Sequence, residues 1–134
     1  MSNKTIGNKF EEEFCEMMFK HGFWAHNMAQ KSAGQPADVI AVKNEKAYLI
    51  DCKVCTTTKG FALSRIEDNQ ENAMMLWHKR TGKTGWFAIR YELEDEVIML
   101  SFTQLKILRE DHSYLNYQDA VCYGKYFEDW VNGS

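Results

Sequence analysis

The chain lacks the features that mark membrane-spanning and exported proteins. Among its 134 residues, no segment approaches the roughly 18 consecutive apolar residues of a membrane-spanning helix. The start, Met1-Ser2-Asn3-Lys4, leads into polar residues and not into the apolar region of a signal peptide. We therefore expect a cytoplasmic protein with no membrane partner.

Proline is scarce, and the cysteines do not suggest a disulfide scaffold. A single proline, with 45% apolar and 13% aromatic residues, argues against disorder and for a packed mixture of helices and strands. The length is that of one ordinary domain, so a single domain is expected over residues 1–134. Because nothing marks the chain as exported, its four cysteines are expected to be reduced.

Two of these cysteines, Cys52 and Cys55, form a C-x-x-C pattern of the kind found in zinc sites and redox pairs. They lie in or just after an extended apolar run, where residues three apart point to opposite faces of a strand. The sequence has no second cysteine pair to complete a zinc site. The pattern therefore favours two independent thiols.

A surplus of basic residues, which nucleic-acid-binding domains usually show, is also missing. The formal net charge is −3, which works against a DNA partner. The charge is unevenly distributed, however: residues 1–65 carry nine Lys or Arg and seven Asp or Glu, whereas residues 66–134 carry seven and twelve. The N-terminal half is therefore the more favourable half for DNA.

Hydrophobic spacing and turn residues predict the order of the elements. They predict a helix over 9–22, a strand over 23–29, a polar connection over 30–36, a hairpin of strands 37–42 and 47–54, a loop over 56–60, a helix over 64–80, a hairpin of strands 85–91 and 96–102, and a short helix from a Thr103 cap to Leu108. Residues 117–130 form either a helix or an aromatic strap over the core. This order predicts an α/β fold with a mixed central β-sheet flanked by helices.

The first predicted helix carries three consecutive acids, Glu11, Glu12 and Glu13. Residues one apart on a helix are rotated by about 100°, so the three cannot share one orientation. Glu11 follows Phe10 and borders the apolar face most closely. Glu12 and Glu13 are expected on the solvated face, although either replaces Glu11 if the helix has a different phase.

The second strand of the first hairpin places an acid and a base on one surface. Side chains alternate along a strand, so Asp51 and Lys53 project to one face while Cys52 projects to the other. Antiparallel pairing would bring Asp38, at the start of the first strand, close to Asp51. Two carboxylates that close repel by about 4 kcal/mol at an effective dielectric near 20, and a divalent cation would resolve the conflict.

Magnesium suits such a pair because it prefers oxygen ligands, uses one or two carboxylates and accepts water and substrate phosphate. The ion would supply an activated water and neutralise charge that develops on a phosphate. The ammonium of Lys53 would orient the water or stabilise the transition state.

These residues resemble a known nuclease pattern. Pro36-Ala37-Asp38, twelve further residues and Asp51-Cys52-Lys53 resemble the PD-(D/E)xK nuclease motif. The segment Gly7 to Glu11 is similar to the Gly-x-x-x-Glu opening of the first helix in Holliday junction resolvases of the archaeal and RecU types. Segment 31–34 resembles the loop before the motif Asp in the archaeal type, and segment 61–70 resembles the post-motif region of the RecU type.

The resemblance covers residues 4–105 and implies a restriction-endonuclease-like core. It implies that Glu11, Asp38 and Asp51 bind Mg²⁺, with Mn²⁺ as a substitute, and that Lys53 is catalytic. Ser32 and Gln70 would support the site or contact DNA. The implied function is a metal-dependent, structure-selective DNA endonuclease, specifically a Holliday junction resolvase that acts as a homodimer because symmetric resolution needs two nicks.

Two other functions stay open. The pattern lacks the long insertion before Asp38 that forms a stalk in the RecU type, and its second acid is Asp where Glu is commoner. A restriction-like or repair nuclease with other DNA substrates would also fit the core. The acidic net charge is compatible with a noncatalytic binding module that keeps the nuclease fold.

Overall fold

The structure is a computed structural model that describes residues 3–28 and 37–133. The elements run in the order α1 (Asn3–Lys20), β1 (Trp24–Asn27), β2 (Val39–Lys43), β3 (Lys46–Cys55), β4 (Phe61–Ala62), the 3-10 helix η1 (Leu63–Arg65), α2 (Asp68–Thr81), β5 (Trp86–Tyr91), β6 (Glu96–Ser101), α3 (Phe102–Leu108), β7 (Tyr114–Leu115), α4 (Tyr117–Tyr123), β8 (Lys125–Tyr126) and α5 (Phe127–Asn132).

A mixed sheet forms the centre of the fold, as the sequence predicts. Its strand order is β1-β2-β3-β5-β6-β8, and β4 pairs with β7 in a separate small sheet. Only β3 and β5 run parallel within the central sheet, and the other neighbours are antiparallel. A parallel pair needs a long crossover connection, which here contains η1 and α2. The site-bearing strand β3 therefore lies inside the sheet.

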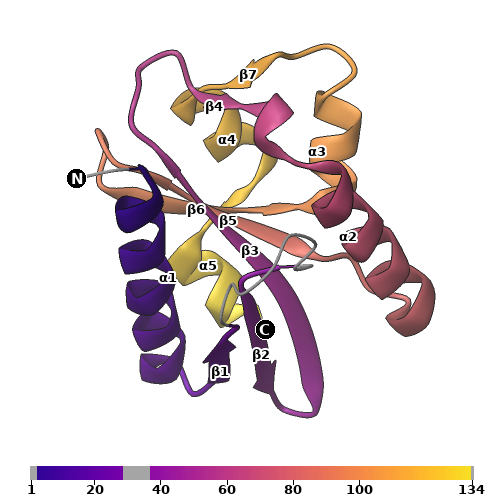
Figure 1. Ribbon diagram of the computed structural model, residues 1–134. Helices are drawn as coiled ribbons and strands as arrows, with labels where there is room; N and C mark the ends of the chain where they lie inside the picture. The colour runs from indigo at the N-terminus through magenta and orange to yellow at the C-terminus, as the bar shows by residue number, and fades with distance from the viewer. Residues whose placement is uncertain (1–2, 29–36, 134) are drawn as a thin grey trace.

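Helices cover both faces of this sheet (Figure 1). One apolar cluster joins α1 and α5 to the side chains of Ile50, Cys52 and Val54 on β3. A second cluster joins α2, α3 and α4 to the opposite face, including Leu49. No helix among the described residues is long and apolar enough to span a membrane.

Helix α1 packs through the predicted apolar positions Phe10, Phe14 and Met18, each at most 2% exposed. The helix starts at Asn3 and not at the predicted Lys9. The prediction started too late because few apolar residues mark the first two turns. Glu12 is exposed and Glu11 is buried. The predicted helix phase is therefore correct.

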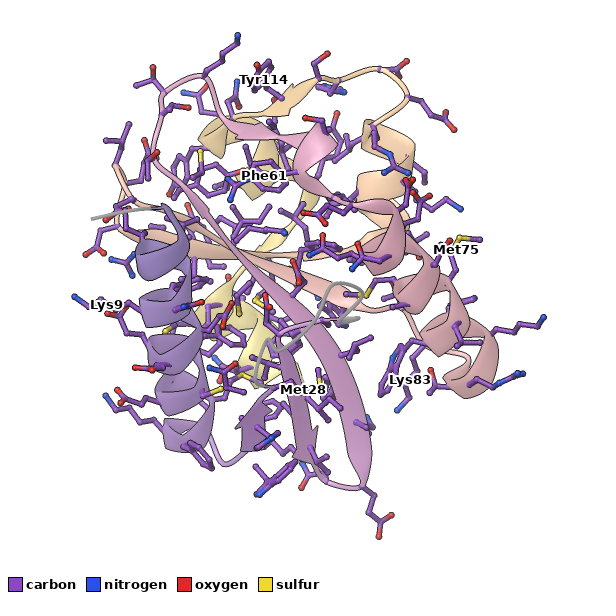
Figure 2. The ribbon with its side chains drawn as sticks, viewed as in Figure 1. Lys9, Met28, Phe61, Met75, Lys83 and Tyr114 are labelled. Carbon is purple, nitrogen blue, oxygen red and sulfur yellow. The ribbon has the colours of Figure 1, made fainter. Side chains whose placement is uncertain are left out.

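Helix α2 differs from the prediction in where it begins. The segment expected to open it forms η1, and α2 starts only at Asp68. Glu67 is the N-cap of a capping box, in which its carboxylate accepts the backbone N–H of Gln70 and the Gln70 side chain accepts the N–H of Glu67. The hydrophobic spacing that predicted a helix over 64–80 does not reveal this cap. Met75 is 48% exposed and points outward in Figure 2.

Two further expectations differ near the C-terminus. Ser101, not Thr103, caps α3 by accepting the N–H of Gln104. Residues 117–130 form neither one helix nor a strap, because Gly124 ends α4 and β8 then adds to the sheet edge before α5. Ala29 and the predicted connection 30–36, with Ser32 and Pro36, lie outside the described residues.

Candidate active site

The site begins with strand alternation on β3. Asp51 and Lys53 project to the same face, and Lys53 Nζ lies 3.2 Å from Asp51 Oδ2. The side chain of Asp51 is fully buried, whereas that of Lys53 keeps 13% of its surface exposed. The strand therefore holds a buried carboxylate beneath an ammonium that reaches solvent.

Asp38 joins this pair through the β2–β3 hairpin. The antiparallel register pairs Val39 with Ile50, and the N–H of Asp38 donates to Ile50 O at 3.2 Å. The carboxylate of Asp38 accepts the backbone N–H of Cys52 at 2.8 Å through Oδ2. The strand thus fixes Asp38 beside Asp51, as the hairpin argument predicted.

Glu11 reaches the same cluster from helix α1. Its burial raises its pKa to about 7, and the charge of Asp38 and a side-chain hydrogen bond with Asp38 add to the shift, while Lys53 opposes it. Helices α1 and α2 pack on opposite faces of the sheet, so Glu11 and the residues of α2 approach the cluster from different sides.

Burial also raises the pKa of Asp51 well above its ordinary value. The neighbouring charge of Asp38 raises it further, and the ammonium of Lys53 lowers it. Three carboxyl groups therefore compete for one cation. Such a cluster is held together either by a retained proton or by additional positive charge.

Gln70, in the first turn of α2, connects the helix to the charged pair. Its Oε1 accepts from Lys53 Nζ at 3.2 Å and from the N–H of Glu67 at 3.1 Å. Its Nε2 donates to Asp51 Oδ1 at 3.4 Å. One amide thus orients the acid and the base and also completes the cap of α2.

A pocket of about 450 Å³ opens over this cluster. Helix α1, strand β3, η1 and the start of α2 supply its lining, which is mostly polar: Ile6, Gly7, Asn8, Glu11, Asp38, Cys52, Lys53, Val54, Thr56, Arg65, Glu67 and Gln70. Asp51 lies below the floor. The arrangement leaves an open, mostly polar space beside the carboxyl groups of Glu11 and Asp38.

The donor atoms of the cluster fit a hard divalent cation. Asp51 Oδ2 is buried and accepts no well-oriented hydrogen bond from the described residues, and the other acids offer only oxygen. Within residues 3–28 and 37–133, no three His, Cys, Asp or Glu side chains already enclose a metal position. Mg²⁺ needs only one or two carboxylates when water and phosphate fill its remaining positions. Asp38 and Asp51 are adequate for that role.

Of the residues predicted for the site, the structure brings together Glu11, Asp38, Asp51, Lys53 and Gln70. Ser32 lies outside the described residues. Sequence reasoning missed the pocket residue Arg65, which no periodic pattern distinguishes from a solvated charge. It also missed the cap at Glu67, because Glu is not among the residue types that usually cap the start of a helix.

The other candidates lie elsewhere. Cys52 and Cys55 are free thiols in the two different apolar clusters, so they share no ligand position. The basic residues after Trp77 are exposed around the end of α2, and Lys83 follows the C-cap of that helix (Figure 2).

Comparison with known families decides what this arrangement belongs to. Residues 2–131 match the archaeal Holliday junction resolvase (Hjc) family. The chain belongs to this family. It is therefore a nuclease that resolves Holliday junctions, as the sequence predicts, and dependence on a divalent metal is general in the family.

A solved structure agrees in fold. The chain is similar to Hjc of Archaeoglobus fulgidus, a Holliday junction resolvase from an archaeal hyperthermophile, with a TM-score of 0.70 and 15% sequence identity. The alignment covers 93% of this chain and 99% of the other. No curated protein matches the chain in sequence. The chain thus has the Hjc fold over nearly its whole length.

Proposed function

We propose that the chain is a Mg²⁺-dependent endonuclease that acts as a homodimer and cuts phosphodiester bonds at four-way DNA junctions through the cluster of Glu11, Asp38, Asp51 and Lys53. The convergence of three carboxyl groups around Lys53 at one polar pocket carries the proposal. Mn²⁺ is expected to replace Mg²⁺, because both accept oxygen ligands. A cytoplasmic location stays a prediction.

In this proposal Asp38 and Asp51 hold the metal and Glu11 completes the acidic site. A bound divalent ion supplies Lewis-acid activation of water and charge neutralisation at phosphate. The N–H of Cys52 holds the Asp38 carboxylate in place. Burial of Asp51 strengthens its attraction for a cation, since water screens the charge poorly there.

Lys53 acts on the substrate from the floor of the pocket. Its ammonium is held between Asp51 and Gln70, which removes much of its conformational freedom before DNA arrives. The exposed part of the group can donate to a phosphate oxygen or to the attacking water. This prepositioned charge stabilises the transition state more than the ground state.

The test compares labelled four-way junction, nicked duplex and linear duplex in Mg²⁺, Mn²⁺ and chelator. We expect paired, symmetric nicks in the junction that require the metal, and loss of more than about 99% of the activity in Asp51→Asn, as when a central group of a catalytic unit is removed. Cleavage of linear duplex alone would favour a restriction-like or repair nuclease.

Metal titration by calorimetry separates catalysis from binding. Wild-type protein is expected to take up Mg²⁺ or Mn²⁺, whereas Asp51→Asn is expected to bind either ion much more weakly. If neither protein binds a divalent ion, the noncatalytic binding module is favoured. Light scattering after gel filtration measures whether the protein is a homodimer. We expect a dimer, because two coordinated nicks need two active sites. A single copy of the chain bound to the junction would refute the homodimer.

A further inference from the structure

Arg65 is a charged residue at the pocket that the catalytic proposal does not use. It is the last residue of η1, which lies between β4 and α2 (Figure 1). Its side chain lines the same pocket as Lys53 and Asp38. The position is exposed, so the side chain is accessible to a ligand that enters the pocket.

The guanidinium group of Arg65 is held in place without being neutralised. Its Nη1 donates to Val54 O at 2.8 Å, and its central carbon lies 5.0 Å from the centroid of the Phe61 ring. Phe61 is fully buried, so it is a fixed surface for stacking. The ion pairs of the described residues do not include Arg65. A guanidinium has five N–H donors, and the hydrogen bond to Val54 uses one.

The other positive features at the pocket are already engaged. Lys53 is paired with Asp51 and bonded to Gln70. The N-terminus of α2, which would otherwise attract an anion, is capped by Glu67 and Gln70. Glu67 even places a carboxylate on the pocket lining. A phosphate that enters the pocket therefore meets in Arg65 the lining cation with the most unused donors, because two of the three ammonium donors of Lys53 are already engaged.

We propose that Arg65 is a DNA-binding residue that clamps a backbone phosphate of the strand entering the pocket through two N–H donors. The proposal rests on the proposed function, since it takes DNA as the ligand of this pocket. A planar guanidinium matches phosphate oxygens in a bidentate geometry that an ammonium cannot reproduce. The contact carries no sequence information, because every phosphate is alike.

The test measures binding of a labelled four-way junction by fluorescence anisotropy, with Ca²⁺ in place of Mg²⁺, over a range of salt concentrations. Arg65→Ala is expected to weaken binding on the order of tenfold, as for one lost charge-assisted contact. The slope of log affinity against log salt should fall by about one. The loss should be equal for junctions with different arm sequences. Arg65→Lys should recover the slope but not the full affinity.

Two further variants serve as a control and as a replacement for Arg65→Ala. Lys125→Ala removes one exposed charge on β8, at the far edge of the sheet, and should change neither slope nor affinity by more than about twofold if the effect is local. Arg65→Gln keeps an amide that can still donate to Val54 O, so it replaces Arg65→Ala if the latter unfolds, with the same expected loss.

The two proposals fail separately. If wild-type protein cuts junctions but Arg65→Ala and Arg65→Gln bind with unchanged affinity and salt slope, the phosphate clamp is refuted and the proposed function stands. If wild-type protein cuts no DNA but its junction binding depends on Arg65 as described, the proposed function is refuted and the clamp stands.

Discussion

Asp51 is a buried carboxyl group that shares the single ammonium of Lys53 with the neighbouring acids. It is fully buried, its Oδ2 accepts no well-oriented hydrogen bond from the described residues, and Asp38 repels it. One ammonium does not offset several neighbouring carboxylates, and an excess of buried negative charge is costly. Without a divalent cation, the protein therefore relieves the conflict by retaining a proton in the cluster, and Glu11 is the acid with a raised pKa in the measurable range.

The first prediction concerns the stability of the metal-free protein against pH. The pKa of Glu11 is about 7 in the folded protein against 4.5 for an ordinary Glu, so between these values the folded state holds a proton that the unfolded chain has lost. Stability therefore falls as pH rises through this window and levels off above it. The expected loss is on the order of 3 kcal/mol. Glu11→Gln should reduce this loss without abolishing it, because the raised pKa of Asp51 acts in the same direction.

Urea unfolding in chelator at pH 5, 6, 7 and 8 measures this effect. Glu16→Gln is the matched control, because Glu16 is exposed on the same helix and should keep the wild-type pH dependence. Parallel curves for wild type and Glu11→Gln would show that Glu11 does not hold the proton.

The second prediction separates the two roles of Gln70. Gln70→Ala removes both the contact with Lys53 and half of the capping box, so we expect a loss of stability of about 1 kcal/mol together with a drop in kcat on the order of tenfold, as for a misplaced catalytic group. Glu67→Ala removes the carboxylate half of the capping box and one negative charge from the pocket lining, but it keeps the contacts of Gln70 with Lys53 and Asp51. It should therefore lower stability without the tenfold drop in kcat. Single-turnover cleavage and thermal melting measure both. Equal kcat in the two variants would rule out a positioning role for Gln70.

At the scale of elements, α1 carries a glycine that its own packing does not require. Gly7 lies within the helix, and a Cβ built there would meet nothing within 4 Å. Glycine in a helix interior is less stable than alanine by roughly 1 kcal/mol. Gly7 also lines the pocket. A methyl group at this position would occupy space that is open to the substrate.

The third prediction is therefore that Gly7→Ala raises the free energy of unfolding by about 0.5 to 1 kcal/mol and lowers kcat/KM for junction cleavage. Glu16→Ala, on an exposed part of the same helix, should leave cleavage unchanged. Denaturant unfolding and initial cleavage rates provide the comparison. Full activity in a stabilised Gly7→Ala protein would show that DNA does not approach this turn.

The elements also show why parts of the site were predictable from sequence. Strand alternation placed Asp51 and Lys53 together, and the apolar positions of α1 selected Glu11 among three acids, because both rest on local periodicity. Arg65 lies in a short 3-10 turn without periodicity, and its partner Val54 is on another element. The capping box at Glu67 starts α2 at Asp68, which is later than the start that the hydrophobic pattern predicted. Contacts between distant segments were thus the part that local patterns could not predict.

At the scale of the whole molecule, the topology explains where the site lies. The β2–β3 hairpin brings Asp38 to Asp51, and the parallel β3–β5 connection returns through η1 and α2 over the same end of β3. Helix α1 covers the other face and adds Glu11 from its own side. The pocket thus depends on both helical layers, and a disturbance of either layer is expected to reach it.

The C-terminal region belongs to this architecture, although the family resemblance in the sequence stopped near residue 105. Trp130 of α5 is 4% exposed, stacks on Phe23 at 5.8 Å between ring centroids, and meets Tyr48 and Trp86 edge-on. These rings come from the segment after α1 and from two central strands. We therefore propose that the chain folds as a single domain in which α5 seals one face of the sheet.

The last prediction tests this single domain. Trp130→Ala is expected to lower the free energy of unfolding on the order of 3 to 5 kcal/mol, as for other buried aromatic truncations, and to do so in one transition seen equally by far-UV and near-UV circular dichroism. Trp24→Ala is the control, because Trp24 is 57% exposed and stacks only on His26 among the described rings. A separate early transition that leaves the sheet intact would contradict the single domain. In that case α5 would unfold independently, and its aromatic contacts would contribute nothing to the stability of the strands that hold Asp38 and Asp51.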